Sequence, residues 1–354
     1  MSPMHAPDAA STGVSVQVGQ HALSLRDLRL ADRDALLALH TEVFGPEVDA
    51  RWFDWKYGQA ADQGQGQALG AWHGDVLIAC CGGLPRNLWF QGRPVAGLQM
   101  GDVMVHPAWR GILTRRGPFF HVTQCFHRSR LGAAPQRQFQ VGFGFPNQRH
   151  LQLGVVLGLV HDAGVIESLH WEPLPATPPA LPWLWRWQEL TSANFAGVVD
   201  RAWQSMQAQG QHLMLGQRDA AYLRWRYLAR PGAAGVLAAA PPRYRFFTLR
   251  QRFGSSTGVA VLDLRSAVAH WLDWVGPIKL MALASQACRI EAGRAGASEL
   301  SAWASAAVAQ QLATSGMARR EVCAGLGVSA ASVPSARDQA ALPWWLMGGD
   351  TDFL

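Results

Sequence analysis

The sequence predicts a mixed α/β fold divided into two domains, and three observations support this. The chain has 354 residues, of which 49% are apolar, so it can bury a large core and exceeds one typical domain of roughly 100–200 residues. Strand patterns and helix patterns succeed one another along the first half. A nine-residue motif recurs after 170 residues, which indicates that a whole domain has been duplicated.

The first regular elements expected are a short strand at Leu25 and a helix that begins after Asp32, a plausible N-cap, and ends near Gly45. Four apolar side chains mark its buried stripe, namely Leu36, Leu37, Leu39 and Val43. Residues 1–22 are polar at their start and lack an apolar segment, so we expect them to be disordered and not to be a signal peptide.

A meander of strands follows this helix. Two apolar runs break at short turns, residues 73–75 and 91–93, and each run is typical of an antiparallel hairpin. Beyond them the pattern predicts a helix over 118–131, a strand over 138–146 and a helix over 147–157 that ends at Gly158.

Residues 167–190 are rich in proline and tryptophan, which predicts a semi-rigid linker between a first domain over 23–166 and a second over 191–354. The tryptophans at 183, 185 and 187 alternate as on a strand. Either they hold the linker against the domains, which we favour, or they line an acyl or substrate groove.

The repeated motif reads DARWFDWKY at 49–57 and DAAYLRWRY at 219–227. Aspartate, alanine, tryptophan and tyrosine occupy matched places, and a hairpin pattern follows each copy. The second half then diverges, with a helix expected near 298–315 and a terminal strand over 342–353.

Composition excludes several classes of protein. The net charge is +6 and comes almost entirely from arginine, which reflects either phosphate recognition or a codon bias. No basic run exceeds two residues, so a nucleic-acid surface is not expected, and no apolar run is long enough to span a membrane. Five cysteines without a C-x-x-C pair favour reducing cytoplasm over a disulfide framework. His121, Cys125 and His127 lack a second cluster with zinc spacing, so we predict no metal site.

Two motifs stand in a characteristic order. A V-x-P-x-x-R-G turn spans residues 105–111, and a helix that opens with Pro146-Asn147 ends in Leu157-Gly158. With the strand, helix and meander before them, they resemble the GNAT acyltransferase superfamily over residues 24–165. The repeat then indicates a second, degenerate copy from about residue 195. This resemblance implies two GNAT-like domains, each with a mixed, mostly antiparallel central sheet flanked by helices.

The resemblance implies an acyl-CoA co-substrate, most simply acetyl-CoA, and no metal. A strand that leaves its neighbour exposes backbone groups that can pair with the amides of a pantetheine arm. The turn after it aims N–H groups at the pyrophosphate, and arginines add charge-assisted hydrogen bonds. The residues expected to bind the cofactor are Val103, Met104, Val105, Arg110, Gly111, Thr114, Arg115, Arg116, Gly117 and Asn147.

The turn departs from the usual R-G-x-G-h-G pattern, since residues 110–117 read RGILTRRG. Either two residues are deleted after Gly111, which we favour, or Leu113 and Arg115 stand where glycines belong. Glycine serves such a turn because it accepts positive φ and lets the backbone approach a phosphate.

The catalytic pattern departs as well. Many GNAT enzymes carry a tyrosine acid four residues before the final glycine of the L-G pair, and that position is Gly154 here. His150, one turn earlier, is the substitute we predict for the acid. Asp102, at the start of the cofactor strand, is the best candidate for the base that deprotonates an amine. The alternative is a strand-edge carboxylate paired with an arginine.

Four acidic residues could bind the amine acceptor, which the resemblance leaves open as a small molecule, a peptide or a sugar. They are Glu42 and Glu47, near the end of the first helix, and Asp350 and Asp352, at the C-terminus. The alternative is that these carboxylates only face solvent.

The leading hypothesis is therefore an acyltransferase that binds one cofactor per chain, because the second copy lacks a counterpart of the V-H-P-A-W-R-G turn. One alternative is a protein that binds CoA esters, or acts as a scaffold, without catalysis. Another is a FemABX-like transferase that uses aminoacyl-tRNA. The oligomeric state cannot be predicted from these patterns.

Overall fold

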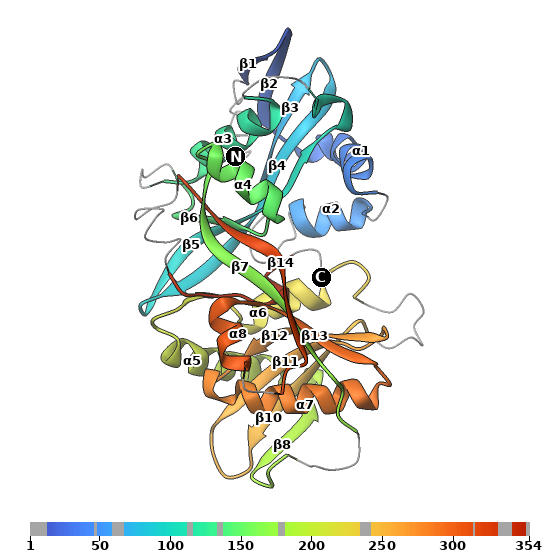
Figure 1. The fold of residues 1–354 in the computed structure, drawn as a ribbon, viewed down its shortest axis with the longest axis vertical. Helices are drawn as coiled ribbons and strands as arrows, with labels where there is room; N and C mark the ends of the chain where they lie inside the picture. The colour runs from blue at the N-terminus through green and yellow to red at the C-terminus, as the bar shows by residue number, and fades with distance from the viewer. Residues whose placement is uncertain are drawn as a thin grey trace, which may run out of the picture.

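The computed structural model describes residues 13–45, 48–58, 67–111, 116–132, 137–175, 181–233, 242–313, 316–331 and 342–351. The described strands form one mixed sheet that runs through both halves of the molecule (Figure 1). Its main path has the order β1-β2-β3-β4-β5-β6-β14-β7-β13-β12-β11-β10-β8. The prediction of a mixed α/β fold is confirmed.

The first half begins with the hairpin β1–β2 and continues with helices on both sides of a meander. Its elements are β1 (Val14–Val18), β2 (His21–Asp27), α1 (Arg33–Phe44), α2 (Ala50–Tyr57), β3 (Gln67–His73), β4 (Val76–Phe90), β5 (Arg93–Val105), α3 (Pro118–Arg130), β6 (Val141–Gly144), α4 (Gln148–Val156) and β7 (Val160–Trp171). The helices predicted after Asp32, over 118–131 and over 147–157 are confirmed.

The second half repeats this order of elements. Its members are β8 (Trp185–Glu189), α5 (Phe195–Gln209), α6 (Ala220–Leu223) with a π-helical turn (Arg224–Leu228), β10 (Tyr244–Gln251), β11 (Thr257–Asp263), β12 (Val268–Val275), α7 (Met281–Arg294), β13 (Glu299–Ser305), α8 (Ala306–Leu312) and β14 (Arg319–Ser329). Two short strands, β9 (Met214–Gly216) and β15 (Trp344–Trp345), pair with each other beside β4. Each element of the first half from β2 to β7 thus has a counterpart.

The two halves exchange their last strands. β14 lies between β6 and β7, whereas β7 lies between β14 and β13, and every one of these pairings is antiparallel. Figure 1 shows β7 and β14 side by side where the upper and lower parts of the molecule meet. Because each half lends a strand to the other, their sheets cannot separate without breaking backbone hydrogen bonds.

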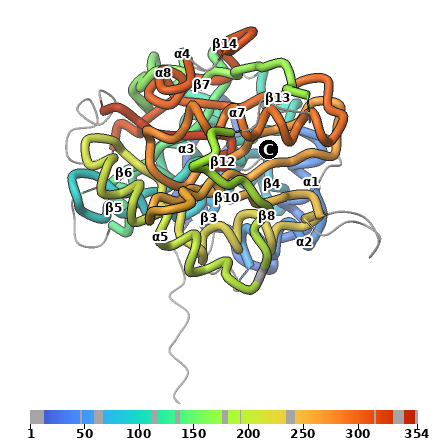
Figure 2. Tube along the Cα trace, turned by 90° about the horizontal axis from the view of Figure 1, so that it is seen from below, coloured from blue at the N-terminus to red at the C-terminus, as the bar shows by residue number. Residues whose placement is uncertain are grey.

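Helices cover both faces of the sheet. In the second half α7 and α5 lie on opposite sides of β10 and β12 (Figure 2). In the first half α1 and α2 cover one face and α3 the other, so the adjacent Cys80 and Cys81 of β4 point into different hydrophobic clusters. The larger cluster includes residues from both halves, which therefore share one core.

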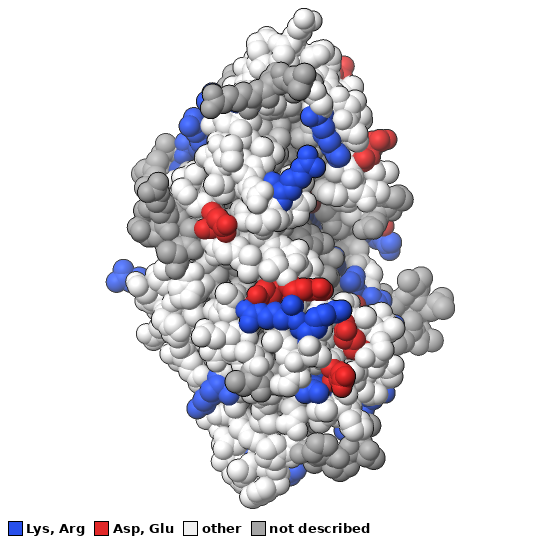
Figure 3. Space-filling view, viewed as in Figure 1, with Lys and Arg blue, Asp and Glu red and all other residues white. Residues whose placement is uncertain are grey.

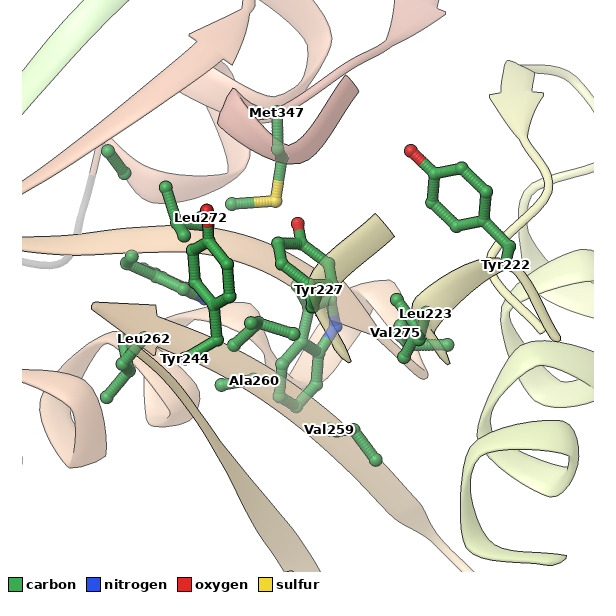
Figure 4. Packing of buried hydrophobic residues seen from close by; sticks show 14 of the residues in the cluster. Tyr222, Leu223, Tyr227, Tyr244, Val259, Ala260, Leu262, Leu272, Val275 and Met347 are labelled. Atoms are coloured by element: carbon green, nitrogen blue, oxygen red, sulfur yellow. The ribbon is translucent and has the colours of Figure 1, made fainter. Parts of the chain in front are cut away.

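The motif repeats lie in this shared core. Figure 4 shows Tyr227 and Tyr244 packed beside Leu272, with Met347 of the C-terminal segment close by. The Tyr227 and Tyr244 rings meet edge to face with centroids 5.1 Å apart.

Several boundaries differ from those predicted. Residues 14–18 form a strand instead of disorder, because the alternating VSVQV sequence pairs in register with β2. The expected linker contains strand residues at both ends, 167–171 and 185–189, since its prolines are confined to the middle. The helix expected near 298–315 begins only at Ala306, and the preceding residues form β13. The expected terminal strand is only two residues long, followed by a 3-10 turn at 348–350.

Candidate functional site

An opening in the sheet forms where β5 leaves β6. The two strands pair in parallel only from Gly97 to Met100, and the last pair joins Met100 to Gly144. Beyond it, none of the described strands pairs with residues 101–105 on that side, while β4 continues to pair with the other side. Val103 is 37% exposed at this free edge and Met104 is 1% exposed. Residues 103–105, where the resemblance expects the cofactor strand, therefore have no strand partner on this side among the described residues.

Asp102 lies at an irregularity of the β4–β5 pairing. Its φ of 47° falls in the left-handed region, which aspartate tolerates better than most residues. The register between the strands shifts between Cys80 and Gly82, and a side chain at Gly82 would meet the Tyr57 hydroxyl at 2.4 Å. The bulge turns the Asp102 side chain into the protein.

The Asp102 carboxylate is paired inside the protein. Its Oδ2 lies 2.8 Å from Lys56 Nζ and also accepts a hydrogen bond from the Tyr57 hydroxyl. The Lys56 and Asp102 side chains are only 1% and 8% exposed. The structure thus favours the alternative interpretation of Asp102, a carboxylate held in an ion pair. Its partner is a lysine of α2, whereas the sequence predicted an arginine.

The turn after β5 leads to a helix end that lacks a side-chain cap. Gly117 occupies the N-cap position of α3, and no acidic residue lies in the first turn. The N-termini of α2 and α4, by contrast, are capped by Asp49 and Asn147. An uncapped helix N-terminus has free N–H groups and a positive dipole end, which together favour an anion.

Two arginines stand before and after residues 111–115 of the turn that leads to this helix. Arg110 donates from Nε to the Val105 carbonyl oxygen at 2.9 Å, and the Arg116 guanidinium lies 5.0 Å from the Phe120 ring centroid. Residues 112–115, and with them Thr114 and Arg115, lie outside the described residues. The choice between a deletion and substituted glycines in the turn thus stays a prediction.

α4 forms the far side of the opening. Asn147 accepts a hydrogen bond from the His150 N–H at 2.9 Å, so this predicted cofactor residue serves as the N-cap. Partial burial lowers the pKa of His150, and the positive charges of Arg149 and Arg110 lower it further. The neutral imidazole is therefore favoured at pH 7.

Gly154 is buried against the strand that follows its helix. A Cβ there would lie 2.8 Å from Val160 Cγ2. A side chain at this position, where the resemblance expects a tyrosine acid, would therefore have to displace the Val160 side chain.

The equivalent opening in the second half is filled by the chain itself. β12 leaves β13 after the pair His270–Ser301. The C-terminal segment, residues 344–351, occupies the space beyond, where Ser305 N–H donates to the Leu346 carbonyl at 2.9 Å and Met347 bridges to Ala304. α7 also begins soon after β12, at Met281, so no long basic turn separates them.

The paired carboxylate has a counterpart in the second half as well. The Tyr227 hydroxyl donates to Asp273 Oδ2 at 3.1 Å, as the Tyr57 hydroxyl donates to Asp102. Asp273 is neutralised by Arg218, whose Nε lies 2.7 Å from Asp273 Oδ1. The repeated tyrosine thus holds an aspartate in both halves, a relationship that the sequence motif contained but that sequence analysis missed.

Two of the four predicted acceptor residues, Glu42 and Asp350, lie within the described residues. Glu42 is exposed on the last turn of α1, whereas Glu47 and Asp352 lie outside the described residues. Asp350 is 1% exposed, and its two oxygens pair with Arg86 and Arg218. The solvent-facing interpretation is therefore wrong for Asp350, and the same two arginines occupy the oxygens that an acceptor ammonium would need.

Among the residues that the structure describes, no group of three or more histidine, cysteine or acidic side chains is arranged so that it could hold a metal ion. His127 is buried and its Nδ1 lies 3.0 Å from Ser329 Oγ. All five cysteines fall within the described ranges and are free. No helix in these ranges is long and apolar enough to cross a membrane.

Known proteins share part of this sequence and much of this fold. Residues 24–119 match the family model described as acetyltransferase (GNAT) domain. Among curated proteins no sequence matches the chain.

Solved structures match over most of the chain. A GCN5-related N-acetyltransferase from Kribbella flavida is 14% identical over 86% of this chain and 70% of its own, with a TM-score of 0.59. A probable N-acyltransferase from Enterococcus faecalis is 12% identical, covering 86% and 71%, at 0.60. A GCN5-related N-acetyltransferase from Anabaena variabilis is 12% identical, covering 88% and 73%, also at 0.60. The resemblance to the GNAT superfamily is confirmed: the chain contains a GNAT domain match over residues 24–119 and has the fold of GCN5-related N-acetyltransferases.

Proposed function

We propose that this protein transfers an acyl group from acyl-CoA to an amine, and that the first half binds the acyl-CoA. The observation that carries the proposal is the opening between β5 and β6. It offers an unpaired strand edge at 103–105 directly before a basic turn and the uncapped N-terminus of α3. These two features fit the amide-rich and the phosphorylated parts of one ligand.

The charges around the opening also suit an anionic ligand. Arg110, Arg116 and Arg149 are exposed, and none of them forms a salt bridge with a residue that the structure describes. Desolvated charge-assisted hydrogen bonds contribute roughly 1.5–3 kcal/mol each, and exposed ones less. Arg110 is also positioned by its bond to Val105, which orients its guanidinium at the strand edge.

We further propose one acyl-CoA per chain and a tandem arrangement of two GNAT-like units. The repeated order of elements supports two units, with first and second ranges near 23–166 and 191–354. Residues 344–351 fill the second opening with an apolar segment and a buried carboxylate. A ligand could enter there only by displacing this segment from the shared core.

Two side chains bear on the chemistry at the acceptor amine, Asp102 and His150. Asp102 is held in a buried pair with Lys56, so its first role is to position the bulge. His150, whose pKa is lowered by burial and by the charges of Arg149 and Arg110, is the neutral group proposed for proton transfer. Catalysis would then depend chiefly on holding amine and thioester in register, which can contribute about 7–11 kcal/mol.

Calorimetric titration with acetyl-CoA and with a long-chain acyl-CoA tests the binding step. Saturable heat with one site per chain supports the proposal, and absence of heat with both ligands overturns it. Release of CoA thiol in the presence of a panel of small amines, amino sugars and peptides then tests transfer.

The alternative of a CoA-ester-binding protein or scaffold without catalysis is favoured by one observation, the packing of Gly154 against Val160 in place of a tyrosine acid. Saturable binding without thiol release for any amine would select it. A gel shift with bulk tRNA at physiological salt tests the FemABX-like alternative, and we expect no shift.

A further inference from the structure

The end of the molecule opposite the N-terminal hairpin carries an exposed aromatic tip. We define the tip as residues 181–186 before and in β8, with residues 249–256 of the β10–β11 hairpin. It includes the largest exposed aromatic side chains of the described chain, Trp183 at 69% and Phe253 at 76%, with Leu184 at 38%. β8 lies at the lower end of the molecule in Figure 1.

Backbone hydrogen bonds and a ring contact hold the two segments of the tip together. The Arg252 N–H donates to the Leu184 carbonyl at 2.7 Å, and the Trp185 N–H donates to the Pro182 carbonyl at 2.8 Å. The Trp183 and Phe253 rings meet edge to face with centroids 5.9 Å apart. Two loops from distant parts of the sequence are thus tied together so that they present aromatic surface to solvent, which costs free energy unless something covers it.

The charge around these rings has one sign. Arg186, Arg250 and Arg252 are exposed, and no salt bridge joins them to a described residue. Neither residues 181–188 nor residues 249–256 include an acidic residue. On the face drawn in Figure 3, acidic side chains lie over the upper and middle parts of the molecule and none shows at its lower end.

Two of these arginines are placed against each other. Arg186 and Arg250 are direct partners in the β8–β10 register. Like charges directly opposite one another destabilise a strand pair. An anion that contacts both guanidinium groups would remove this repulsion, so the pair itself points to an anionic partner.

We propose that the tip docks on an anionic membrane surface. Tryptophan and phenylalanine insert their rings at the boundary between headgroups and acyl chains, and arginines beside them contact lipid phosphates. The Trp183 and Phe253 rings come from two loop ends that contact each other. An exposed ring pair of this kind suits a planar layer better than the groove that a single nucleic-acid strand requires. The contact is peripheral and separate from the opening between β5 and β6.

Sedimentation with sucrose-loaded vesicles tests this proposal on the full chain. Binding to phosphatidylglycerol-containing vesicles should exceed binding to phosphatidylcholine vesicles by about 100-fold at low salt, since each basic residue near an anionic surface contributes about fivefold. Arg250→Gln with Arg252→Gln should lower binding to the phosphatidylglycerol-containing vesicles by about 25-fold. Trp183→Ala with Phe253→Ala should lower it by about tenfold or more while the far-ultraviolet circular dichroism stays unchanged.

Val76→Ala with Arg128→Gln is the matched control, because it removes an exposed apolar side chain and an exposed arginine from the first half. It should bind vesicles as the unchanged protein does. The proposal is overturned if the unchanged protein ignores anionic vesicles, or if the control loses as much binding as the tip variants. It is also overturned if the aromatic double variant binds vesicles normally while heparin and tRNA compete equally, because the tip would then be a general polyanion site.

Discussion

Trp55 and Trp225 stack face to face, with ring centroids 5.0 Å apart and planes 13° from parallel. Each indole N–H donates to the main-chain carbonyl of the other residue, at 3.0 Å from Trp55 and 3.4 Å from Trp225. The two residues occupy the same place in the repeated motif, 170 positions apart. Such reciprocity is what a local two-fold relationship between the halves requires.

Replacing either tryptophan by phenylalanine should therefore have the same effect. Each change keeps most of the stacking but removes one buried hydrogen bond and leaves a carbonyl without its donor, which costs about 1–3 kcal/mol. Urea denaturation should give similar losses for Trp55→Phe and Trp225→Phe, and a coupling of roughly 0.5–3 kcal/mol in the double variant. Strongly unequal losses would contradict the proposed symmetry of the contact.

The buried pair of Lys56 and Asp102 leads to a second prediction. Lys56→Met should lower the free energy of unfolding by about 3–5 kcal/mol, because it leaves the Asp102 carboxylate buried without its counter-ion. Lys56→Met combined with Asp102→Asn should cost less than the sum of the single changes.

The exposed pair of Arg51 and Asp49 is the control for that experiment. Both side chains are more than half exposed, at 81% and 51%, so Arg51→Met should cost less than about 1 kcal/mol. If Lys56→Met proves equally mild, the Asp102 carboxylate has access to water and remains available as a base.

How much of this could be read from the sequence depends on distance along the chain. The elements of the first half were predicted because turn residues such as Gly45 and Gly158 act over a few residues. Asp32 does stand at the N-cap position of α1, but its side chain makes no cap hydrogen bond there and instead accepts from Arg26 and from the Arg29 N–H. The exchange of β7 and β14 was not predicted, because strand order depends on contacts between residues that are far apart in the sequence.

The candidate site shows the same division. The strand at 103–105 and the basic turn after it were expected from local motifs through the family resemblance, and their role in binding a cofactor stays a prediction. The partner of Asp102 was not, because Lys56 reaches it from another element, and neither was the burial of Asp350 by Arg86 and Arg218. The motif repeat did contain the missing signal, since Tyr57 and Tyr227 each hold an aspartate.

His127 leads to a prediction about pH. Burial lowers its pKa from 6.5 to about 4, so the folded protein holds it neutral while the unfolded chain takes up a proton. Its contribution to stability is complete above pH 6.5 and is lost as the pH falls towards 4, by roughly 3 kcal/mol over this window. Chemical denaturation at several pH values should show this slope.

His127→Gln should flatten the slope, because glutamine does not titrate. An equal slope in the protein with and without His127 would assign the acid sensitivity to other groups.

Arg110 and Arg116 test the proposed ligand site. Arg110→Ala and Arg116→Ala should each weaken acyl-CoA binding by about tenfold at low salt, and by less at high salt, because partly exposed charge-assisted bonds are screened. Arg128→Ala, on the exposed side of α3, should leave the calorimetric affinity unchanged. Unaltered affinity in both site variants would mean that the turn no longer binds a phosphate.

Asp350 separates a structural role from a role in acceptor binding. Its carboxylate joins Arg86 to Arg218 and caps the N–H of Met347, all in the buried contact between the C-terminal segment and the second opening. Asp350→Asn should therefore lower the free energy of unfolding by about 3–5 kcal/mol, because two buried arginines lose a counter-charge. Acyl-CoA affinity, and KM for any amine that proves to be a substrate, should not change at temperatures where the variant is folded. A rise in KM for the amine at unchanged stability would instead place Asp350 in the acceptor site, and would require the C-terminal segment to leave the second opening during turnover.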